Sequence, residues 1–373
     1  MEKVLKRLQA QSDLRERTRD LKLGELQLPS IELLEKKLPE WILFEKLLAD
    51  LESIGRVHVL GVTSSAHHQL PLIAMSFGSQ DPKAPVLALF GGVHGLERIG
   101  SQVVLALMRS FSELLLWDQL LQDALSKLRV VFFPMVNPLG IMNMRRANPN
   151  GVDLMRNSPI TALEKPTFLV GGHLISPKLP WYRGHNGMEP ESQALIQLCK
   201  EQFFESSAVV TVDFHSGFGT QDRLWFPYAK TREPFPHLPE MYALSEKFER
   251  TFPNHFYRIE PQAKNYTTHG DLWDYLYDEY MKTNSGTYLS LTLEMGSWMW
   301  VRKNPLQLFS SLGPYHPIKP HRQKRILRRH ITLFDFLVRT VISHSSWSSL
   351  SSEQRNKNKD RAYDLWYPHL EKK

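Results

Sequence analysis

A buried strand followed by a tight turn can be read from one stretch of the sequence, Val86-Leu87-Ala88-Leu89-Phe90-Gly91-Gly92-Val93-His94-Gly95-Leu96-Glu97. Its five leading apolar residues are typical of a strand covered on both faces, and the glycine pair predicts a turn directly after it. In open α/β sheets, ligands bind beyond the carboxyl ends of the strands. We therefore expect His94 and Glu97 to lie at the ligand-binding edge of a sheet.

Strand and helix patterns alternate around this stretch. Further short apolar runs occur at 57–60, 72–75, 130–133, 209–212 and 288–293, bounded by Ser, Gly, Asp and Pro. Helical periodicity lies between several of them, notably at 100–127 and 191–204. This alternation predicts an α/β fold with a mixed, mostly parallel sheet that is flanked by helices on both faces.

The chain divides into three segments by composition. Residues 1–54 predict a helical lead-in, interrupted by Pro39, and residues 55–343 carry the sheet pattern and all the chemistry discussed below. A basic amphipathic helix is expected at 321–343, packed on the sheet by its apolar side. The remaining segment, 344–373, is a polar C-terminal tail, whose part 344–362 has too little apolar surface to fold alone. We expect this part to be mobile, with Trp366 and Tyr367 as residues that could dock back.

The amino-acid composition limits the kinds of protein and site that this chain can form. The 373 residues are 42% apolar, which suffices for a globular core. Cys199 is the only cysteine, so disulfides within the chain and thiolate-rich metal sites are excluded. We expect neither a signal peptide nor a membrane span, and therefore a cytoplasmic location. The net charge of +7 is modest for this size, so a nucleic acid is not the expected partner. The sequence specifies no oligomeric state.

Two histidines and one carboxylate form a candidate metal site. His94 and Glu97 are three residues apart at the start of a helix, so both side chains can reach one ion. His237-Leu238-Pro239-Glu240 has the same spacing but follows no strand, which shows that the spacing alone means little. The run 209–212 is followed by Asp213-Phe214-His215, which carries the chain past the end of the strand, so His215 can supply a third ligand. This set is typical of a catalytic zinc ion, one per chain, with a fourth position open to water.

Other polar residues near the same edge could complete an active site. Glu294 follows the apolar run 288–293, where a carboxylate is costly to bury, and we interpret it as a general base. A fourth metal ligand or a structural ion pair are the alternatives for this residue. Arg145, Arg146 and Arg156 could bind a substrate carboxylate or an oxyanion, or could be solvated loop residues. Tyr266 is a possible phenolic donor, although the residues alone favour this only weakly.

These motifs resemble the zinc metallocarboxypeptidase superfamily, which includes murein-peptide amidases and the succinylglutamate desuccinylase and aspartoacylase branch. The resemblance covers about residues 55–340 and implies a carboxypeptidase-like sheet of about eight strands. It assigns His94, Glu97 and His215 to zinc and Glu294 to the general base. The signature Gly151-Val152-Asp153-Leu154-Met155-Arg156-Asn157 aligns Arg156 with the arginine that holds a terminal carboxylate, and Arg146 with the arginine that polarises the scissile carbonyl. Tyr266 aligns with a mobile tyrosine, and Asn137-Pro138-Leu139-Gly140 with a structural turn.

One residue departs from the family pattern. The asparagine that usually precedes the carboxylate-binding arginine is Met155 here, and methionine has no amide to donate. The sequence therefore supports zinc binding more strongly than it supports the removal of terminal residues from peptides. The stretch 213–219, followed by Leu224-Trp225-Phe226-Pro227-Tyr228, is most similar to a poorly characterised bacterial branch.

The function we predict is zinc-dependent hydrolysis of an amide or peptide bond near a free carboxylate, through zinc-bound water and a glutamate base. The substrate would be a peptide or a small acidic amide. One alternative is an N-acyl amino acid amidohydrolase of the desuccinylase or aspartoacylase kind, which uses the same zinc and base. The other is a catalytically silent protein that keeps the fold and binds peptide tails.

Overall fold

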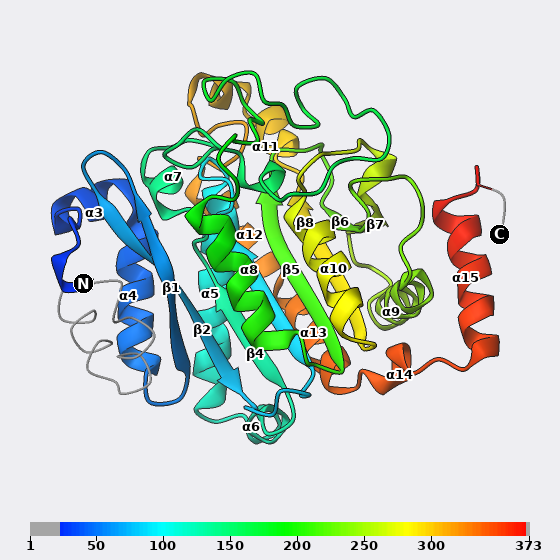
Figure 1. The fold of residues 1–373 in the computed structure, drawn as a ribbon. Helices are drawn as coiled ribbons and strands as arrows, with labels where there is room; N and C mark the ends of the chain where they lie inside the picture. Colours follow the sequence, from blue (N-terminus) through cyan, green and yellow to red (C-terminus); the bar gives the residue numbers. More distant parts are fainter. Residues whose placement is uncertain (1–22, 371–373) are drawn as a thin grey trace.

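One eight-stranded mixed sheet runs through the computed structural model, which describes residues 23–370 of the chain (Figure 1). The strand order is β1-β2-β4-β3-β5-β8-β6-β7. The strands are β1 (Arg56–Ser64), β2 (Gln69–Gly78), β3 (Val86–Gly91), β4 (Arg129–Phe133), β5 (Ala208–Ser216), β6 (Arg223–Phe226), β7 (Arg258–Pro261) and β8 (Thr287–Met295). The helices are α3 (Ile31–Lys37), α4 (Pro39–Leu51), α5 (Arg98–Leu115), α6 (Gln119–Leu125), α7 (Pro138–Met142), α8 (Pro190–Phe203), α9 (Leu238–Thr251), α10 (Leu272–Thr283), α11 (Trp298–Lys303), α12 (Pro320–Arg329), α13 (Ile331–Ile342), α14 (Ser345–Ser348) and α15 (Ser352–Trp366), with short 3-10 turns η1 (Leu23–Glu25), η2 (Leu154–Arg156), η3 (Gln262–Lys264) and η4 (Pro305–Phe309).

The centre of the sheet is parallel. Strand β3 pairs in parallel with β4 and β5, and β5 pairs in parallel with β8. The pairs β1–β2, β2–β4 and β6–β8 are antiparallel. Every residue of β3 and β5 is buried, which explains why these strands read as continuous apolar runs and not as alternating patterns. The predicted fold class, a mixed and mostly parallel sheet of eight strands flanked by helices, is confirmed.

Helices cover both faces of the sheet, as Figure 1 shows. On one face α8 packs on β1 and β2, and α10 packs on β8. On the other face α5 and α13 pack on β3 and β5, and α12 lies against α5. Because both faces are covered, the open end of the strands, where β3, β5 and β8 finish side by side, is the place left for a ligand.

Two features of the elements differ from the expectation. The short strands β6 and β7 are not predicted, because four residues each carry too little pattern to be recognised. The helix expected at 321–343 is divided into α12 and α13 at His330. This residue is buried and its Nδ1 lies 2.8 Å from the hydroxyl of Tyr257. Of the predicted N-terminal helical segment, residues 1–22 lie outside the described range, and the rest contains α3 and α4 with Pro39 opening α4.

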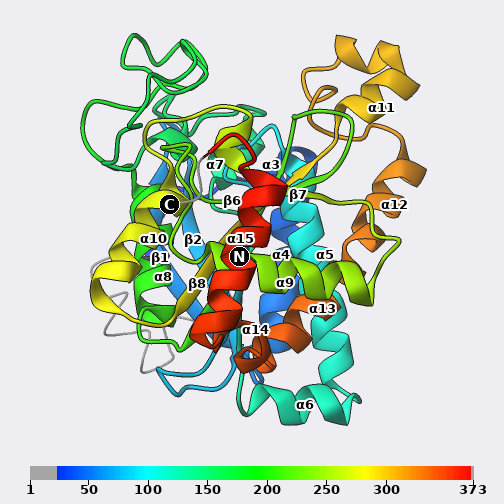
Figure 2. The same cartoon turned by 90° about the vertical axis from the view of Figure 1, so that its right-hand side faces the viewer.

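The C-terminal segment, expected to be mobile up to residue 362, forms a helix. Ser351 caps α15, and its side chain and that of Gln354 bond reciprocally to backbone N–H groups. Figure 2 shows α15 crossing α9, against which it packs. Trp366 is buried with its ring 4.7 Å from that of Phe226, and its indole N–H donates to the carbonyl of Ile259. The helix is therefore fixed by a few buried contacts with α9 and with the edge of the sheet. The apolar content of the segment itself does not explain it.

Replacing Trp366 with alanine is expected to lower the free energy of unfolding by about 3–5 kcal/mol, because a large buried ring and its hydrogen bond are lost together. Denaturant unfolding of the purified protein measures this change. Leu365→Ala on the same helix is the matched control, since Leu365 is 57% exposed and its removal should change the stability by less than about 1 kcal/mol. Equal stability of the two variants would show that α15 is not held by Trp366.

Within residues 23–370, no single helix combines the length and the apolar character that a membrane span requires. Helices α5 and α6 together meet the length and composition criteria, but they are bent by 106° relative to each other. Most of the apolar residues of α5 are buried under the sheet, as expected for a helix of the protein core.

Candidate active site

Three buried side chains converge at the carboxyl ends of β3 and β5. His94 lies in the turn after β3, Glu97 is the residue before α5, and His215 is the penultimate residue of β5. The Nδ1 atom of His94 lies 2.9 Å from Oε1 of Glu97, and the Nδ1 atom of His215 lies 2.9 Å from Oε2 of the same carboxylate. One ligand atom of each residue lies within 4.8 Å of the others. The structure thus brings all three predicted metal ligands to a common point.

Glycines make this turn possible. Gly92 has a φ of +68°, in the left-handed region that side chains rarely adopt, and a Cβ there would meet Oγ of Ser101 at 2.3 Å. A Cβ on Gly95 would meet the backbone carbon of Gly140 in α7 at 2.1 Å. The chain between β3 and α5 can therefore pass close to α7 and still present His94 and Glu97 on the same side.

Two buried aspartates orient the histidine rings. Oδ1 of Asp153 lies 3.0 Å from Nε2 of His94, and Oδ2 of Asp213 lies 2.7 Å from Nε2 of His215. The indole N–H of Trp273 also donates to Oδ2 of Asp213 at 2.9 Å. When each Nε2 holds a proton for its aspartate, each Nδ1 is left as an acceptor that faces the common point. Such carboxylate–histidine pairs are the usual outer contacts of a bound zinc ion.

The charged groups of the cluster shift one another's pKa values. Burial alone would raise the pKa of Glu97, but His94 and His215 lower it far below its ordinary value. Burial would lower the pKa of His215, but Asp213 and then Glu97 raise it well above its ordinary value. The anionic carboxylates thus favour a positive charge at this point, which can be a proton or a metal ion.

Glu294 lies beside this cluster at the end of β8. It is paired with His215 across the β5–β8 ladder, so the two side chains start from the same level of the sheet. Burial, followed by repulsion from Glu97, raises the pKa of Glu294 to about 8. Its Oε2 atom is buried and forms no hydrogen bond within the described part of the chain. A carboxylate that is poised to titrate near neutral pH, with a free oxygen, is suited to proton transfer.

Arg146 also contacts the cluster. Its Nη1 donates to Oε1 of Glu97 at 3.0 Å, and its Nε donates to Oδ2 of Asp153 at 2.8 Å. The guanidinium is therefore fixed by two buried carboxylates next to the point where the ligand atoms converge. A planar donor in that position can bind an oxygen that becomes negative during a reaction.

Arg156 and Tyr266 lie together at a second part of the site. Arg156 is buried, and three of its N–H groups donate to the carbonyls of Val170 and Met155. A guanidinium has five such groups, so two remain for other partners. Burial raises the pKa of the Tyr266 phenol, while Arg156, to which the phenol hydrogen-bonds, opposes the rise. The charge of Glu294 also raises the pKa of this phenol and that of Arg146 lowers it, so Tyr266 lies near Glu294.

Arg145 is the predicted site residue that lies apart. It is exposed and lines a separate pocket with residues of α3 and of the turn between β1 and β2. Two successive residues of a non-helical loop can point to different sides, so Arg146 faces the cluster while Arg145 does not. The pair His237 and Glu240 also lies elsewhere: Nδ1 of His237 is 3.0 Å from the Tyr277 hydroxyl, and Glu240 pairs with Arg355.

The sequence motifs assign no role to three residues that lie near the site. Asp213 stands two residues before His215, and residues i and i+2 of a strand share a face, so this spacing could have indicated the contact. Trp273 could not be placed from the sequence. Arg183 lies next to Arg156: its Nε donates to the Arg156 carbonyl at 3.3 Å, and burial, followed by repulsion from Arg156, lowers the pKa of Arg183. The guanidinium of Arg183 thus lies beside Arg156, the candidate for binding a substrate carboxylate.

The donor set fits a zinc ion. Two imidazole nitrogens and a carboxylate are a standard catalytic zinc set, and the outer nitrogen of each ring has a buried carboxylate partner. Within the described residues no other group of three histidine, cysteine or carboxylate side chains has this geometry.

Comparisons with known proteins agree with this geometry. A family model described as zinc carboxypeptidase matches residues 44–304. Carboxypeptidase SOL1 of Arabidopsis thaliana is 25% identical over 240 residues, which are 60% of this chain and 42% of that protein. The chain thus spans less than half the length of this curated relative.

Solved structures with the same fold include thrombin activatable fibrinolysis inhibitor, with a TM-score of 0.61, 17% identity, and coverage of 93% of this chain and 80% of that one. Carboxypeptidase A from Helicoverpa armigera has a TM-score of 0.55 and 15% identity, and covers 82% of this chain and 71% of that one. At these identities the likeness concerns the fold alone. The family match confirms the resemblance drawn from the four sequence motifs.

Proposed function

The chain belongs to the zinc carboxypeptidase family, and from this premise we propose that it is a zinc-dependent hydrolase that removes a residue from the carboxyl end of a peptide. The observation that carries the proposal is the convergence of His94, Glu97 and His215 on one point with Glu294 beside it. One zinc ion would be held by Nδ1 of each histidine and by the Glu97 carboxylate. A bound zinc ion acts as a Lewis acid that acidifies water and polarises a carbonyl.

In the proposed reaction, Glu294 accepts a proton from the attacking water and delivers it to the leaving nitrogen. Its Oε2 atom makes no hydrogen bond within the described residues and can accept the proton, and a divalent cation nearby would favour the deprotonated form that this step needs. Arg146 donates N–H groups to the carbonyl oxygen as negative charge develops there. Its fixed position between Glu97 and Asp153 means that little reorganisation is needed during the reaction.

Arg156 is proposed to hold the terminal carboxylate of the substrate. The guanidinium is fixed by backbone carbonyls, and a fourth N–H group bonds the Tyr266 oxygen, so one N–H group and the positive charge remain for a substrate carboxylate. Tyr266 is proposed to donate its phenol near the same group. The long loop 158–188 contributes Val170 and Arg183 to the surroundings of Arg156 and would shape the pocket for the terminal side chain.

Arg156→Gln is expected to raise KM for peptides with a free terminal carboxylate about 10- to 100-fold, because a charge-assisted pair is lost. Steady-state kinetics on one peptide in free-acid and amidated forms measures this change. The amidated peptide is the control, since it lacks the carboxylate and should react equally slowly with the wild-type protein and the variant. An equal loss on both forms would contradict the role of Arg156 as the carboxylate-binding residue.

A second candidate is hydrolysis of N-acyl amino acids, and Met155 favours it. This residue replaces the family's usual asparagine and is buried among apolar side chains, so it offers no amide to a peptide carboxylate. A smaller substrate that relies on fewer contacts would tolerate this change. Parallel assays of terminal peptide trimming and of N-acyl amino acid deacylation separate the two candidates, because both require the same zinc and Glu294.

The proposal is tested by incubating the zinc-loaded protein with a mixed peptide library and identifying the released residues by mass. Single residues released from carboxyl ends, with no release after chelation of the metal, are the expected result. Hydrolysis of N-acyl amino acids in the parallel assay, with no release from the peptides, would favour the second candidate. A zinc-bound protein that releases nothing would support a binding protein without catalytic activity and would overturn the proposed hydrolysis.

A further inference from the structure

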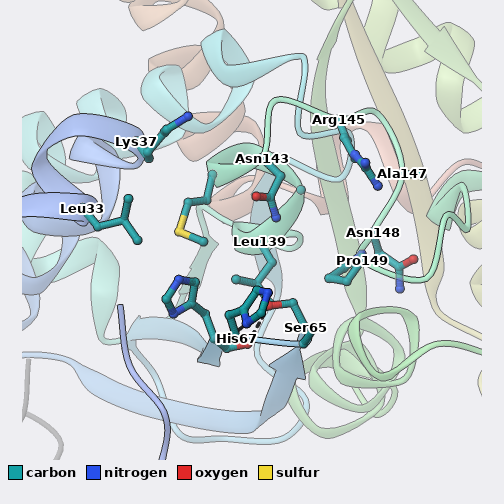
Figure 3. A pocket seen from close by; sticks show the side chains of 14 residues that line it. Leu33, Lys37, Ser65, His67, Leu139, Asn143, Arg145, Ala147, Asn148 and Pro149 are labelled. Carbon is teal, nitrogen blue, oxygen red and sulfur yellow. Dashed lines mark hydrogen bonds between the residues drawn. The ribbon is translucent and has the colours of Figure 1, made fainter. Parts of the chain in front are cut away.

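A pocket lies next to the candidate active site. It has a volume of about 560 Å³ and is enclosed by α3, the turn between β1 and β2, α7 and the loop that follows α7 (Figure 3). Leu33 and Leu139 supply apolar surface to it. Leu33 and Lys37 come from α3, which precedes the residues that match the family model, so part of this pocket is built by a segment outside the family's common region.

The pocket is lined by basic side chains from three separate segments. Lys37 comes from α3, His67 comes from the β1–β2 turn, and Arg145 comes from the loop after α7 (Figure 3). The neighbour of His67 in the turn, His68, also lines the pocket. No aspartate or glutamate of residues 23–370 is among the lining residues. Lys37 and Arg145 form no ion pair with any residue in the described range. Four basic side chains around one concave surface, without a compensating acid, favour an anionic ligand.

The wall of this pocket is held rigidly. Asn148 is buried, and its amide donates to Glu189 at 2.8 Å and to Glu191 at 3.1 Å. Its side-chain oxygen accepts from the backbone N–H groups of Asn150 and Val152. The loop that carries Arg145 is therefore tied to the start of α8, and the pocket is present before any ligand binds.

The pocket and the metal site share one wall. Gly140 lines the pocket, and the same backbone lies so close to Gly95, next to His94, that no Cβ fits between them. The N–H of Arg145 donates to the carbonyl of Gly140, and the next residue, Arg146, reaches Glu97. A peptide bound in extended form near Glu97 and Arg146 could therefore place other side chains over this wall.

We propose that this pocket binds carboxylate groups of an acidic peptide, so that substrates with acidic side chains upstream of the cleaved bond are preferred. The identity of the ligand as a substrate rests on the proposed hydrolase function. Anion binding by Lys37 and Arg145 does not, because it requires neither zinc nor Glu294. A free anion such as phosphate offers the same chemistry, and the experiment separates the two sources.

The test uses a hexaglutamate peptide with an acetylated amino end and an amidated carboxyl end, titrated into the full zinc-loaded chain. This peptide has no terminal carboxylate, so it can bind only through its side chains. Blocked hexaglutamine is the neutral control and should not bind. In the double variant Lys37→Gln/Arg145→Gln, the Kd for the blocked hexaglutamate is expected to rise about tenfold or more, because two charge-assisted contacts are lost.

The variant Lys127→Gln/Arg302→Gln is the matched control. It also removes one lysine and one arginine, both exposed, that lie outside the pocket, and its Kd should equal that of the wild-type protein. Inorganic phosphate is titrated separately. Phosphate binding that depends on Lys37 and Arg145, without peptide binding, would identify a free anion as the ligand and retain the anion pocket. Equal peptide binding by the two double variants, or no binding of either anion, would overturn the proposal.

The failure of this proposal and the failure of the hydrolase function can be told apart. Blocked peptides are not cleaved by a carboxypeptidase, so the titration reports the pocket even if the protein is inactive. Release of terminal residues from neutral peptides reports the active site even if the pocket binds nothing.

Discussion

Replacing Glu294 with glutamine is expected to slow turnover about a hundred-fold or more while the protein still binds zinc. Glutamine has nearly the same shape as glutamate but cannot accept and return a proton. Glu294 is not one of the three converging ligands, and its side-chain oxygen is free, so its replacement should leave the ligand geometry unchanged. The expected result is therefore a loss of kcat with normal zinc content.

The pH profile gives a second readout for Glu294. In the metal-free protein its pKa is raised to about 8, and a divalent cation beside it would lower that pKa by favouring the charged carboxylate. In the zinc-loaded protein, activity should thus rise with pH through a pKa below 8 and lose this rise in Glu294→Gln. Glu205→Gln, on the surface, is the control and should match the wild-type profile. Full activity of Glu294→Gln would rule out its role as the base.

Replacing His215 with alanine is expected to weaken zinc binding more than about a hundred-fold and to abolish measurable hydrolysis. The loss of an outer carboxylate partner alone typically weakens metal binding 10- to 100-fold, and the loss of a direct ligand should exceed this. Asp213→Asn should fall between the wild-type protein and His215→Ala, because Asp213 only orients the His215 ring. Zinc content by elemental analysis and competition with a chelator measure all three proteins.

His237→Ala is the matched control for this experiment. His237 has the same spacing to Glu240 as His94 has to Glu97, and it is also buried. Its ring contacts the Tyr277 hydroxyl and takes no part in the converging cluster, so the variant should retain one zinc ion per folded chain. If His237→Ala lost the metal and His215→Ala kept it, the assigned site would be wrong.

The sequence could predict the centre of the fold because the strands there are buried on both faces. Strands β3, β5 and β8 appear as uninterrupted apolar runs, and polar residues stand at or near the point where each run ends. Parallel neighbours finish at the same edge, so the sequence alone indicates that His94, His215 and Glu294 lie close together. Their convergence depends only on local pattern and on the rules of parallel sheets.

The features that could not be predicted depend on contacts between distant parts of the chain. The helix α15 carries few apolar residues and is fixed by docking on α9, which no local pattern reveals. Arg145 and Arg146 are neighbours in sequence, yet only the folded loop determines that one faces the metal ligands and the other a separate pocket. Trp273 reaches Asp213 from α10, 60 residues away in the chain.

The contact between Trp366 and Ile259 has a consequence for association between molecules. Strand β7 is the last strand of the sheet, and such a border strand offers unpaired backbone groups to other chains. The indole N–H of Trp366 donates to one of its carbonyls, and the Trp366 ring packs on Phe226 of the neighbouring strand β6. A version of the chain shortened before residue 352 would expose this border, so self-association and poor solubility are to be expected when the last helix is removed for crystallisation.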